Sequence, residues 1–476
     1  MVGGSLGTYL FPIIFSPLLT RIYTPDEFSV YTIYLTIINV VSIIAALKYE
    51  LAIPLVNTSK ERYSLLRLSI INCILFSLLV FIILSVYINY FVFDQITSNY
   101  LFDLQYFVPS GIILTSLFYH IIYNTLLYQK KFNFISISKV VFGFLYATLP
   151  IFIFKYYGLK DYKYLIYSHQ IALGSGLVII LILSFRQMHS SFFYNILIFR
   201  MKDVMAVFKK YKKYPIFSAP SQLINTLGIW LPIIVIWTFF DSNAKYASLY
   251  LLSHRAVNMP VMLLGHSLGK IFYSEAADSL NEGVLSNSIS NYFKILFHLA
   301  LPFIFICLFL APSIFTAVFS EEWSEMGYIV QILSPWLFVT FIAAPLSSIP
   351  TIYYKQELEL KFNSIILLGR FVSLGIGVYY DNLFMALILY SASNCLIWII
   401  YLVYMLKLSN LSISSLLIEC MSNKVEYSIL VSLIILIYYF VNTPIYTLIL
   451  TSLLLIYIAY SFIIMARQNF YESRLK

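Results

Sequence analysis

The sequence predicts an all-α protein that crosses a membrane many times. Of its 476 residues, 61% are hydrophobic and only 11% are charged, whereas roughly a quarter of the residues in soluble proteins are charged. Its mean hydropathy is +0.86, and apolar stretches long enough to cross the hydrocarbon layer as helices recur along the chain. These observations exclude an ordinary soluble enzyme or binding domain.

Apolar windows of about 20 residues predict fourteen spanning helices, six before a basic segment and eight after it. The first six are expected near residues 2–20, 28–47, 68–92, 106–128, 138–157 and 164–185. The other eight are expected near residues 214–240, 246–270, 293–319, 326–350, 364–380, 383–405, 427–441 and 445–465.

The basic segment 186–213 separates two predicted groups of helices. It carries seven Lys or Arg residues and one acid, Asp203. Because Lys and Arg beside spans stay on the cytoplasmic side, we interpret it as a cytoplasmic linker. A solvated amphipathic helix without a further role is the alternative for its individual lysines. The predicted domains are an N-terminal six-helix bundle (1–185), the linker (186–213), a C-terminal six-helix bundle (214–405), and an additional helix pair with a cytoplasmic tail (406–476).

The distribution of basic residues also predicts the orientation. When the expected spans alternate in direction, most of the 30 Lys and Arg residues fall on the side of the N-terminus. This places both termini in the cytoplasm. The net charge of +9 is therefore explained by membrane orientation, and no nucleic-acid partner is expected. The short outer loops leave no room for a soluble catalytic domain, so the function is expected between the helices.

Ionisable residues inside spans are costly and usually face a cavity or a partner. The predicted spans contain no Asp or Glu, but Arg255 lies in an apolar stretch with His254 beside it. We expect Arg255 to face a substrate or a gate, and the alternative is a structural contact with a helix carbonyl. Arg370 and Arg21 lie closer to predicted span ends, where long side chains can extend to the interface.

Lys48 and Glu50 follow the second predicted span. Residues two apart do not share a helix face, so no ion pair between them is expected, and we expect them to close the inner mouth of a pathway. Asp26 is a second acid at the end of a span. Single histidines without a paired spacing and four cysteines without a CxxC motif predict no metal site, and no cofactor is expected.

Several stretches resemble one family of membrane proteins. Residues 18–28 and 48–54 resemble the opening of bacterial Wzx-type polysaccharide flippases, and residues 214–226 resemble the seventh span of that family. The resemblance continues through His254, Arg255, Pro260, Gly265, Trp323, Gly327, Pro335, Trp336, Pro345, Leu346 and Ser347. Many relatives have twelve spans where this sequence predicts fourteen.

The resemblance implies a MOP/MATE-like fold, that of the multidrug/oligosaccharidyl-lipid/polysaccharide exporters, with two six-helix bundles around a central cavity. It also implies that the protein moves an undecaprenyl-diphosphate-linked oligosaccharide to the outer leaflet of the bacterial inner membrane, for O-antigen or capsule synthesis. Polymerase and chain-length proteins of the same pathway are expected partners beside the lipid bilayer. The expected substrate-binding residues are Arg255, Arg21, Arg370, Lys48 and Asn225, and the expected coupling or gating residues are Glu50, Asp26 and His254.

Other functions are weighed against this one. The carrier diphosphate is anionic, which suits cationic spans, whereas an exporter of cationic drugs is expected to place a carboxylate within them. A membrane polysaccharide polymerase or lipid-linked glycosyltransferase is the alternative from another class, but such enzymes generally carry a sizeable outer loop. A third candidate function is a scaffold for the assembly machinery, but this function would not require an arginine inside a span.

Overall fold

The computed structural model is helical throughout the residues that it describes, which are 2–56, 58–91, 95–129, 131–187, 201–240, 245–260, 272, 285–353 and 355–420. Ten helices in these ranges are long and apolar enough to cross a membrane. The protein is thus a multi-pass membrane protein. The predicted spans at 427–441 and 445–465 lie outside the described residues, so the number of fourteen stays a prediction.

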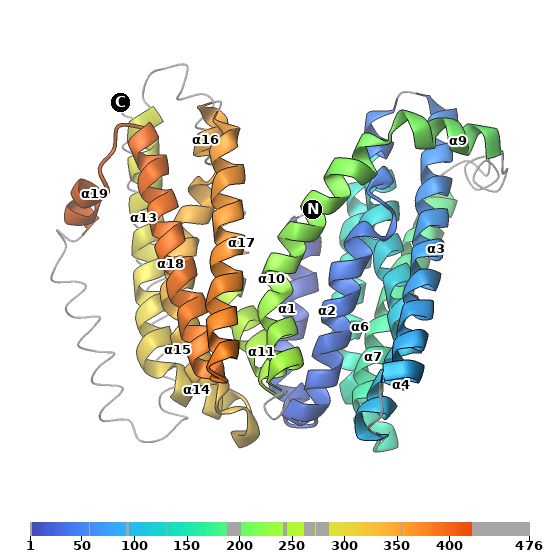
Figure 1. The fold of residues 1–476 in the computed structure, drawn as a ribbon, viewed down its shortest axis with the longest axis horizontal. Helices are drawn as coiled ribbons and strands as arrows, with labels where there is room; N and C mark the ends of the chain where they lie inside the picture. The colour runs from blue at the N-terminus through green and yellow to red at the C-terminus, as the bar shows by residue number, and fades with distance from the viewer. Residues whose placement is uncertain are drawn as a thin grey trace. The chain divides into compact units, whose positions relative to one another are not determined.

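The chain divides into two compact units, Met1–Ser248 and Leu249–Lys476, coloured blue to green and green to red in Figure 1. The first unit comprises α1 (Val2–Leu19), α2 (Pro25–Ala45), the 3₁₀ helix η1 (Tyr49–Leu55), α3 (Ser59–Phe91), α4 (Gln95–Thr115), η2 (Ser116–Ile121), α5 (Ile122–Tyr128), α6 (Phe132–Tyr157), α7 (Tyr162–Gln187), α9 (Met201–Lys210), η3 (Tyr214–Ser218) and α10 (Ala219–Phe239). The second contains most of α11 (Lys245–Pro260), then α13 (Leu285–Phe305), η6 (Ile306–Leu310), α14 (Ala311–Val318), η7 (Glu321–Trp323), α15 (Met326–Leu346), α16 (Ile349–Ile352), α17 (Gln356–Tyr379), α18 (Leu383–Leu408) and α19 (Ile413–Cys420).

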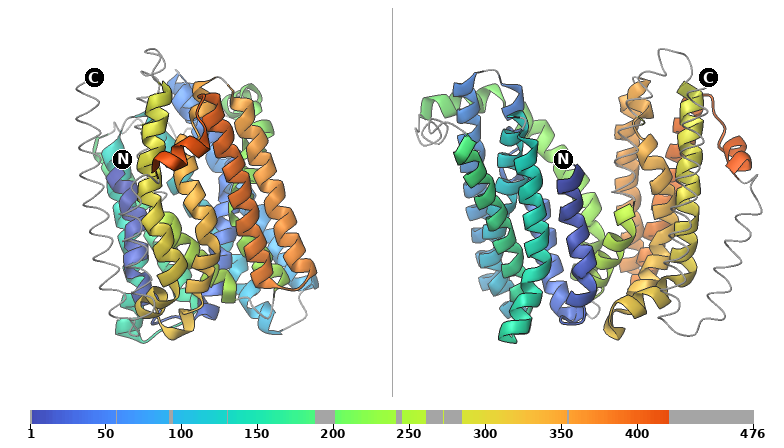
Figure 2. Two further views of the ribbon diagram at one scale, coloured as in Figure 1. Left: turned by 90° about the vertical axis from the view of Figure 1, so that its left-hand side faces the viewer. Right: turned by 180° about the vertical axis from the view of Figure 1, so that it is seen from behind.

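The helices of the first unit pack through small residues and buried aromatic rings. Helix α1 runs along α6, as the right-hand view of Figure 2 shows, and a side chain at Gly143 would collide with the backbone of Gly7. Glycine permits this close approach, which is a common way for membrane helices to associate. Helix α2 packs against α4, α7 and α10. Helix α10, which the sequence places at the start of the second bundle, therefore belongs by packing to the first compact unit.

Three membrane helices contain one wide π turn each. These turns are η2 before α5, η3 before α10 and η6 before α14. They join successive helical segments into single long rods, so that residues 100–126, 214–239 and 285–318 each form one candidate span. The apolar windows in the sequence find these rods but give no sign of the irregular turns within them.

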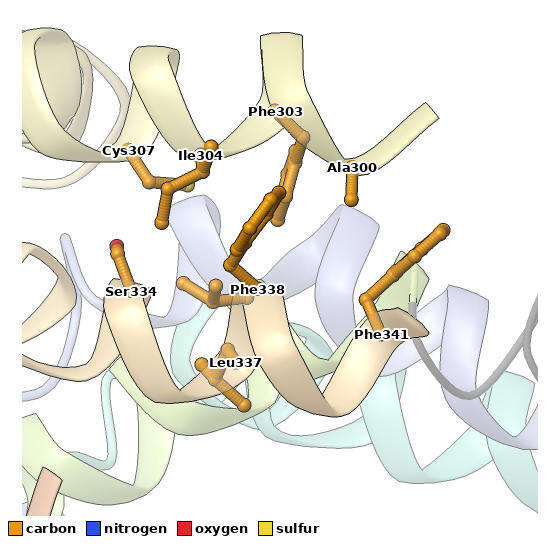
Figure 3. A pocket seen from close by; sticks show the side chains of 9 residues that line it. Ala300, Phe303, Ile304, Cys307, Ser334, Leu337, Phe338 and Phe341 are labelled. Carbon is orange, nitrogen blue, oxygen red and sulfur yellow. The ribbon is translucent and has the colours of Figure 1, made fainter. Parts of the chain in front are cut away.

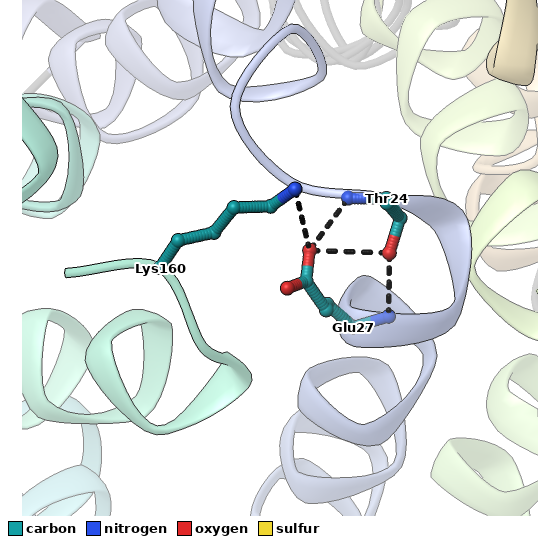
Figure 4. A network of polar contacts seen from close by, with 3 residues as sticks. All are labelled: Thr24, Glu27 and Lys160. Atoms are coloured by element: carbon teal, nitrogen blue, oxygen red, sulfur yellow. Dashed lines mark hydrogen bonds and ion pairs between the residues drawn. The ribbon is translucent and has the colours of Figure 1, made fainter. Parts of the chain in front are cut away.

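A capping box fixes the start of α2 (Figure 4). The Thr24 hydroxyl accepts a hydrogen bond from the backbone N–H of Glu27, and the Glu27 carboxylate accepts one from the backbone N–H of Thr24 at 2.8 Å. Both groups would otherwise be unpaired at the helix end. Lys160, in the turn between α6 and α7, lies 3.9 Å from the same carboxylate. The cap therefore also ties this turn to the start of α2.

The second unit is built around α15, which packs against α13, α14 and α18, while α17 packs along α18 (Figure 2, left). Its apolar core includes Phe293, Phe341 and Met405, all nearly inaccessible to solvent. Helix α17 begins at Gln356, eight residues before the predicted span at 364. This extension matters below, because it moves Arg370 away from the end of the helix.

Removal of the α2 cap gives a direct test of this local structure. Thr24→Ala should lower the free energy of unfolding by about 1 kcal/mol, the usual contribution of an N-cap hydroxyl. Denaturation of the purified protein in detergent measures this. Thr148→Ala is the control, because the Thr148 hydroxyl bonds to Phe144 in its own helix and should contribute little. Equal losses for both variants would contradict a specific capping role.

Candidate substrate-binding site

Arg370 lies within the apolar length of α17 and is held by a neighbouring helix. Its Nε donates a hydrogen bond of 2.9 Å to Oδ1 of Asn394 on α18. Asn394 is fully buried, and its amide nitrogen donates to the Tyr390 carbonyl at 2.7 Å. The interpretation of Arg370 as a residue that extends to the interface stays a prediction, and the structure adds a hydrogen-bond partner on α18. The helix begins earlier than the hydropathy pattern suggests, and the guanidinium is bound to a neighbouring helix of the unit.

Two aromatic rings flank the guanidinium of Arg370. Its central carbon lies 5.8 Å from the ring centroid of Trp336 and 5.9 Å from that of Tyr390. The two rings meet edge to face, with centroids 5.4 Å apart. A cation over an aromatic face is stabilised by the ring quadrupole, and more so where water is excluded. Helices α15, α17 and α18 thus hold one cation in a defined orientation.

His254 joins α11 to this cluster. Its ring stacks against Tyr250 with centroids 5.8 Å apart and against Trp336 with centroids 5.9 Å apart. Arg370 and Arg255 both act electrostatically on His254. We call Tyr250, His254, Arg255, Trp336, Arg370, Tyr390 and Asn394 the cationic cluster. It brings together the three candidate residues that the sequence assigns to this unit.

The cationic cluster is suited to an anion. The exposed acids of the described part of this unit lie in loops and at helix ends, at Glu321, Glu322, Asp381 and Glu419. Trp336 adds a donor, because its indole N–H is buried and finds no hydrogen-bond partner among the described residues. Arginine presents several donors in a fixed plane that matches a phosphate group. The arrangement combines such donors with aromatic rings that hold the guanidinium in place.

An apolar pocket lies beside the cluster, between α11, α13 and α15 (Figure 3). Val257, two residues after Arg255, lines it with Phe303, Phe338 and Phe341. Its polar groups are the Ser334 hydroxyl, which bonds to the Val330 carbonyl, and the Cys307 thiol. No charged residue lines the pocket, so it is a poorer site for an anion than the cationic cluster. No group of three or more potential metal ligands occurs in the parts of the chain with assigned structure.

The other candidate residues belong to the first unit, with two pairs at opposite ends of α2 and Asn225 on α10. Arg21 is exposed in the turn before this helix, and Asp26 is exposed in its first turn. Lys48 and Glu50 follow its last turn, about 30 Å away at the rise of an α-helix. Asn225 is exposed on α10. The structure therefore does not gather these five residues into one site within their unit.

Lys48 and Glu50 form a buried ion pair, which the sequence argument did not expect. The Lys48 ammonium lies 3.7 Å from the Glu50 carboxylate, and their side chains are only 5% and 1% exposed. The expectation assumed that Lys48 and Glu50 lie on a continuous helix, but α2 ends at Ala45. Leu47 and Lys48 adopt left-handed φ angles of 53° and 62°, and the chain then enters η1. This reversal turns the two side chains toward each other.

Burial dominates the electrostatics of the pair. It lowers the pKa of Lys48 and raises the pKa of Glu50, and in each case the partner's charge only partly opposes the shift. One oxygen of the Glu50 carboxylate is buried without a hydrogen-bond partner among the described residues. Both shifts reflect the cost of holding a charge in a buried site.

Sequence reasoning overlooked Asn394, Tyr250 and Tyr390. Asn394 carries the one signal that could have been used, because an amide in the middle of an apolar span requires a buried partner. The two tyrosines could not be separated from the many others in the chain. Trp336 entered only as part of the family resemblance, without a role.

Comparison with solved structures finds this fold in flippases and transporters. The lipid II flippase MurJ in an inward closed conformation has a TM-score of 0.69 at 14% identity, and 99% of each chain is covered. An inward-facing multidrug resistance MATE family transporter of the MOP superfamily has a TM-score of 0.62 at 13% identity, covering 87% of this chain and 94% of its own. A mutant Vibrio cholerae MATE transporter has a TM-score of 0.52 at 14% identity, covering 86% and 94%.

No family model and no curated protein matches the sequence. The structural similarity at these identities shows the fold. This chain accordingly has the MOP/MATE-like fold that the family resemblance implies, and the solved structures that share it include a flippase and a transporter.

The contact between Arg370 and Asn394 can be measured in a double-mutant cycle. Asn394→Leu should lower the free energy of unfolding by about 2 kcal/mol, because a hydrogen bond to a charged group contributes about 1.5–3 kcal/mol. Asn394→Leu with Arg370→Leu should cost less than the sum of the single changes. Asn89→Leu is the control, since exposed Asn89 bonds only within its own helix. Additive losses would show that the two side chains are not coupled.

The buried pair gives a second stability prediction. Lys48→Met and Glu50→Gln should each cost about 3–5 kcal/mol, because each leaves an uncompensated buried charge, and the double variant should recover most of the loss. Unfolding in detergent is again the measurement. Lys60→Met provides the comparison, because it breaks an ion pair with Asp203 in which Lys60 is 68% exposed and should cost at most about 1 kcal/mol. Losses of unfolding free energy in Lys48→Met and Glu50→Gln as small as that in Lys60→Met would argue against a buried pair.

Proposed function

We propose that this protein moves undecaprenyl-diphosphate-linked oligosaccharide units from the inner to the outer leaflet of the bacterial inner membrane by alternating access. The transported units would serve O-antigen or capsule synthesis. The motif resemblance to Wzx-type flippases and the fold shared with a lipid II flippase support this proposal. The observation that carries it is the cationic cluster inside an otherwise apolar unit.

The chemistry of the cluster matches the diphosphate of the proposed substrate. Arg370 and Arg255 supply charge-assisted donors for a diphosphate, and His254 stacks on the same Trp336 that Arg370 contacts. Trp336 and Tyr390 hold the guanidinium in place, and the buried indole N–H, which has no partner among the described residues, can donate to a phosphate oxygen. Asn394 fixes the orientation of Arg370, which spares the substrate part of the cost of ordering that side chain.

Export of cationic drugs is the rival suggested by the MATE structures. A cation would meet Arg255 and Arg370 in the second unit, and the exposed acids described there are outside the cluster. Repulsion from two arginines in a site of low dielectric is unfavourable for such a substrate. The charge of the cluster therefore favours an anion.

Glu50 is the coupling residue that we propose, with Asp26 and His254 as further gating residues. A coupling ion must favour one conformation over the other. Protonation of Glu50 would remove the attraction that holds Lys48 at the reversed end of α2, and so would release that segment. Arg21, Lys48 and Asn225 complete the proposed substrate path in the first unit. Polymerase and chain-length proteins are the proposed partners on the product side.

The leaflet distribution of lipid-linked repeat units tests the function. Spheroplasts with and without the protein would be treated with a membrane-impermeant lectin that binds the repeat unit. Inner-face accumulation in its absence is the expected result. Unpolymerised units that still reach the outer face would instead support the polymerase alternative. Unchanged units together with greater sensitivity to cationic drugs would support drug export.

Arg255→Ala and Arg370→Ala should each slow the appearance of outer-face units at least about tenfold, because a charge-assisted hydrogen bond contributes about 1.5–3 kcal/mol. Arg370→Lys should also be slow, since lysine keeps the charge but loses the planar stacking and the bond to Asn394. Lys407→Ala, which removes an exposed cation at the end of α18, is the control. Normal transport by both alanine variants at normal protein levels would exclude the cluster as the binding site.

A further inference from the structure

Helix α9 is held firmly against the start of α3. It lies across the end of the first unit in Figure 1, and Val204 and Val207 are buried on one side of it. Two ion pairs join it to α3, with Lys60 at 3.0 Å from Asp203 and Lys210 at 2.6 Å from Glu61. The ion pair with Glu61 raises the pKa of Lys210, so this lysine stays charged. The buried valines and these contacts together dock the helix on the unit.

A different face of α9 is apolar and exposed. Met201, Met205 and Phe208 are spaced by four and three residues, which places them along one side of the helix. Their side chains are 61%, 47% and 44% exposed, although Phe208 also touches Tyr49. Exposed apolar residues aligned on one side of a docked helix mark a surface that contacts another apolar partner, either a protein or a membrane.

Lysines border this apolar face. At 100° per residue, Lys202 and Lys209 lie about a quarter turn from Met201 and Met205, on the side away from Val204 and Val207. Both are exposed, and the described acids include none within ion-pair distance of either. Lys212 and Lys213 follow immediately and are also exposed. The order around the helix is thus a docked face, an apolar exposed face and a row of exposed lysines.

The position of α9 along the chain places it at the membrane surface. The next span begins at Tyr214, and Ile216 and Phe217 on it are 56% and 67% exposed. The end of α9 is only about 10 Å from this apolar surface at the helical rise. An amphipathic helix that lies in the interface inserts its apolar side about 5–10 Å into the boundary between headgroups and acyl chains.

We propose that α9 is an interfacial helix that binds the anionic phospholipids of the inner leaflet. Met201, Met205 and Phe208 enter the headgroup boundary, and Lys202 and Lys209 contact lipid phosphates. A soluble acidic partner would pair with the lysines. It would not explain why an exposed apolar face lies beside the start of a membrane span. The proposal does not depend on the transported substrate.

Hydrogen exchange of the full-length protein in vesicles tests the charge contribution. The probes are vesicles of phosphatidylcholine alone and of phosphatidylcholine with phosphatidylglycerol. A lysine at an anionic surface contributes about a fivefold factor to binding, so loss of two should matter by about 25-fold. We expect the amides of 201–213 to exchange more slowly with phosphatidylglycerol, and Lys202→Gln with Lys209→Gln to remove most of the difference. Lys155→Gln with Lys407→Gln, an equal charge change at exposed sites outside α9, should retain it.

Photocrosslinking in native membranes tests the apolar contribution. A photoreactive amino acid at position 205 should form adducts with phospholipid, and the same group at exposed position 206, 100° around the helix, should form far fewer. A protein adduct at position 205 would overturn the proposal in favour of a protein partner. Identical exchange in the two kinds of vesicle would overturn the role of anionic lipid.

Discussion

The cost of leaving a charge or a polar group unpaired in an apolar surrounding governs the organisation of this protein. Arg370 is acceptable inside the second unit because Asn394 orients it and two aromatic rings cover it. Asn394 is in turn satisfied by the backbone of its own helix. These contacts link α15, α17 and α18, and His254 extends the set to α11. The same residues that make the cation tolerable also hold four helices in register.

The all-helical, multi-pass class was predictable from the sequence because the dominant signal is one-dimensional, whereas the number of fourteen spans stays a prediction. An apolar window of fixed length predicts a spanning helix wherever its side chains point, and a low-identity match to MurJ and MATE structures supports the class deduced from such windows. The site was only partly predictable. Arg255, His254 and Arg370 could be identified singly as costly residues, but their grouping depends on contacts between different helices, which hydropathy and spacing do not encode.

The Lys48–Glu50 pair shows where a local rule stops being valid. The spacing argument assumes a continuous helix, yet two successive residues with positive φ end α2 just before the pair. A left-handed conformation costs a residue with a side chain roughly 1–2 kcal/mol, so the surrounding packing must impose it. Tyr49, fully buried between the two charged residues, is part of that packing and reaches Phe208 on α9. The end of α2 and the linker helix are thereby in physical contact.

The π turns have a consequence for how the helices present their side chains. A π turn holds about one residue more than an α turn, so the segment after it is rotated by roughly 100° relative to an uninterrupted helix. In the rod formed by η3 and α10, this phase change falls between the basic linker and Asn225. The direction in which Asn225 projects is thus set by five residues, 214–218. A single deletion there would turn the whole polar and apolar pattern of α10 toward different neighbours while leaving its composition and length almost unchanged.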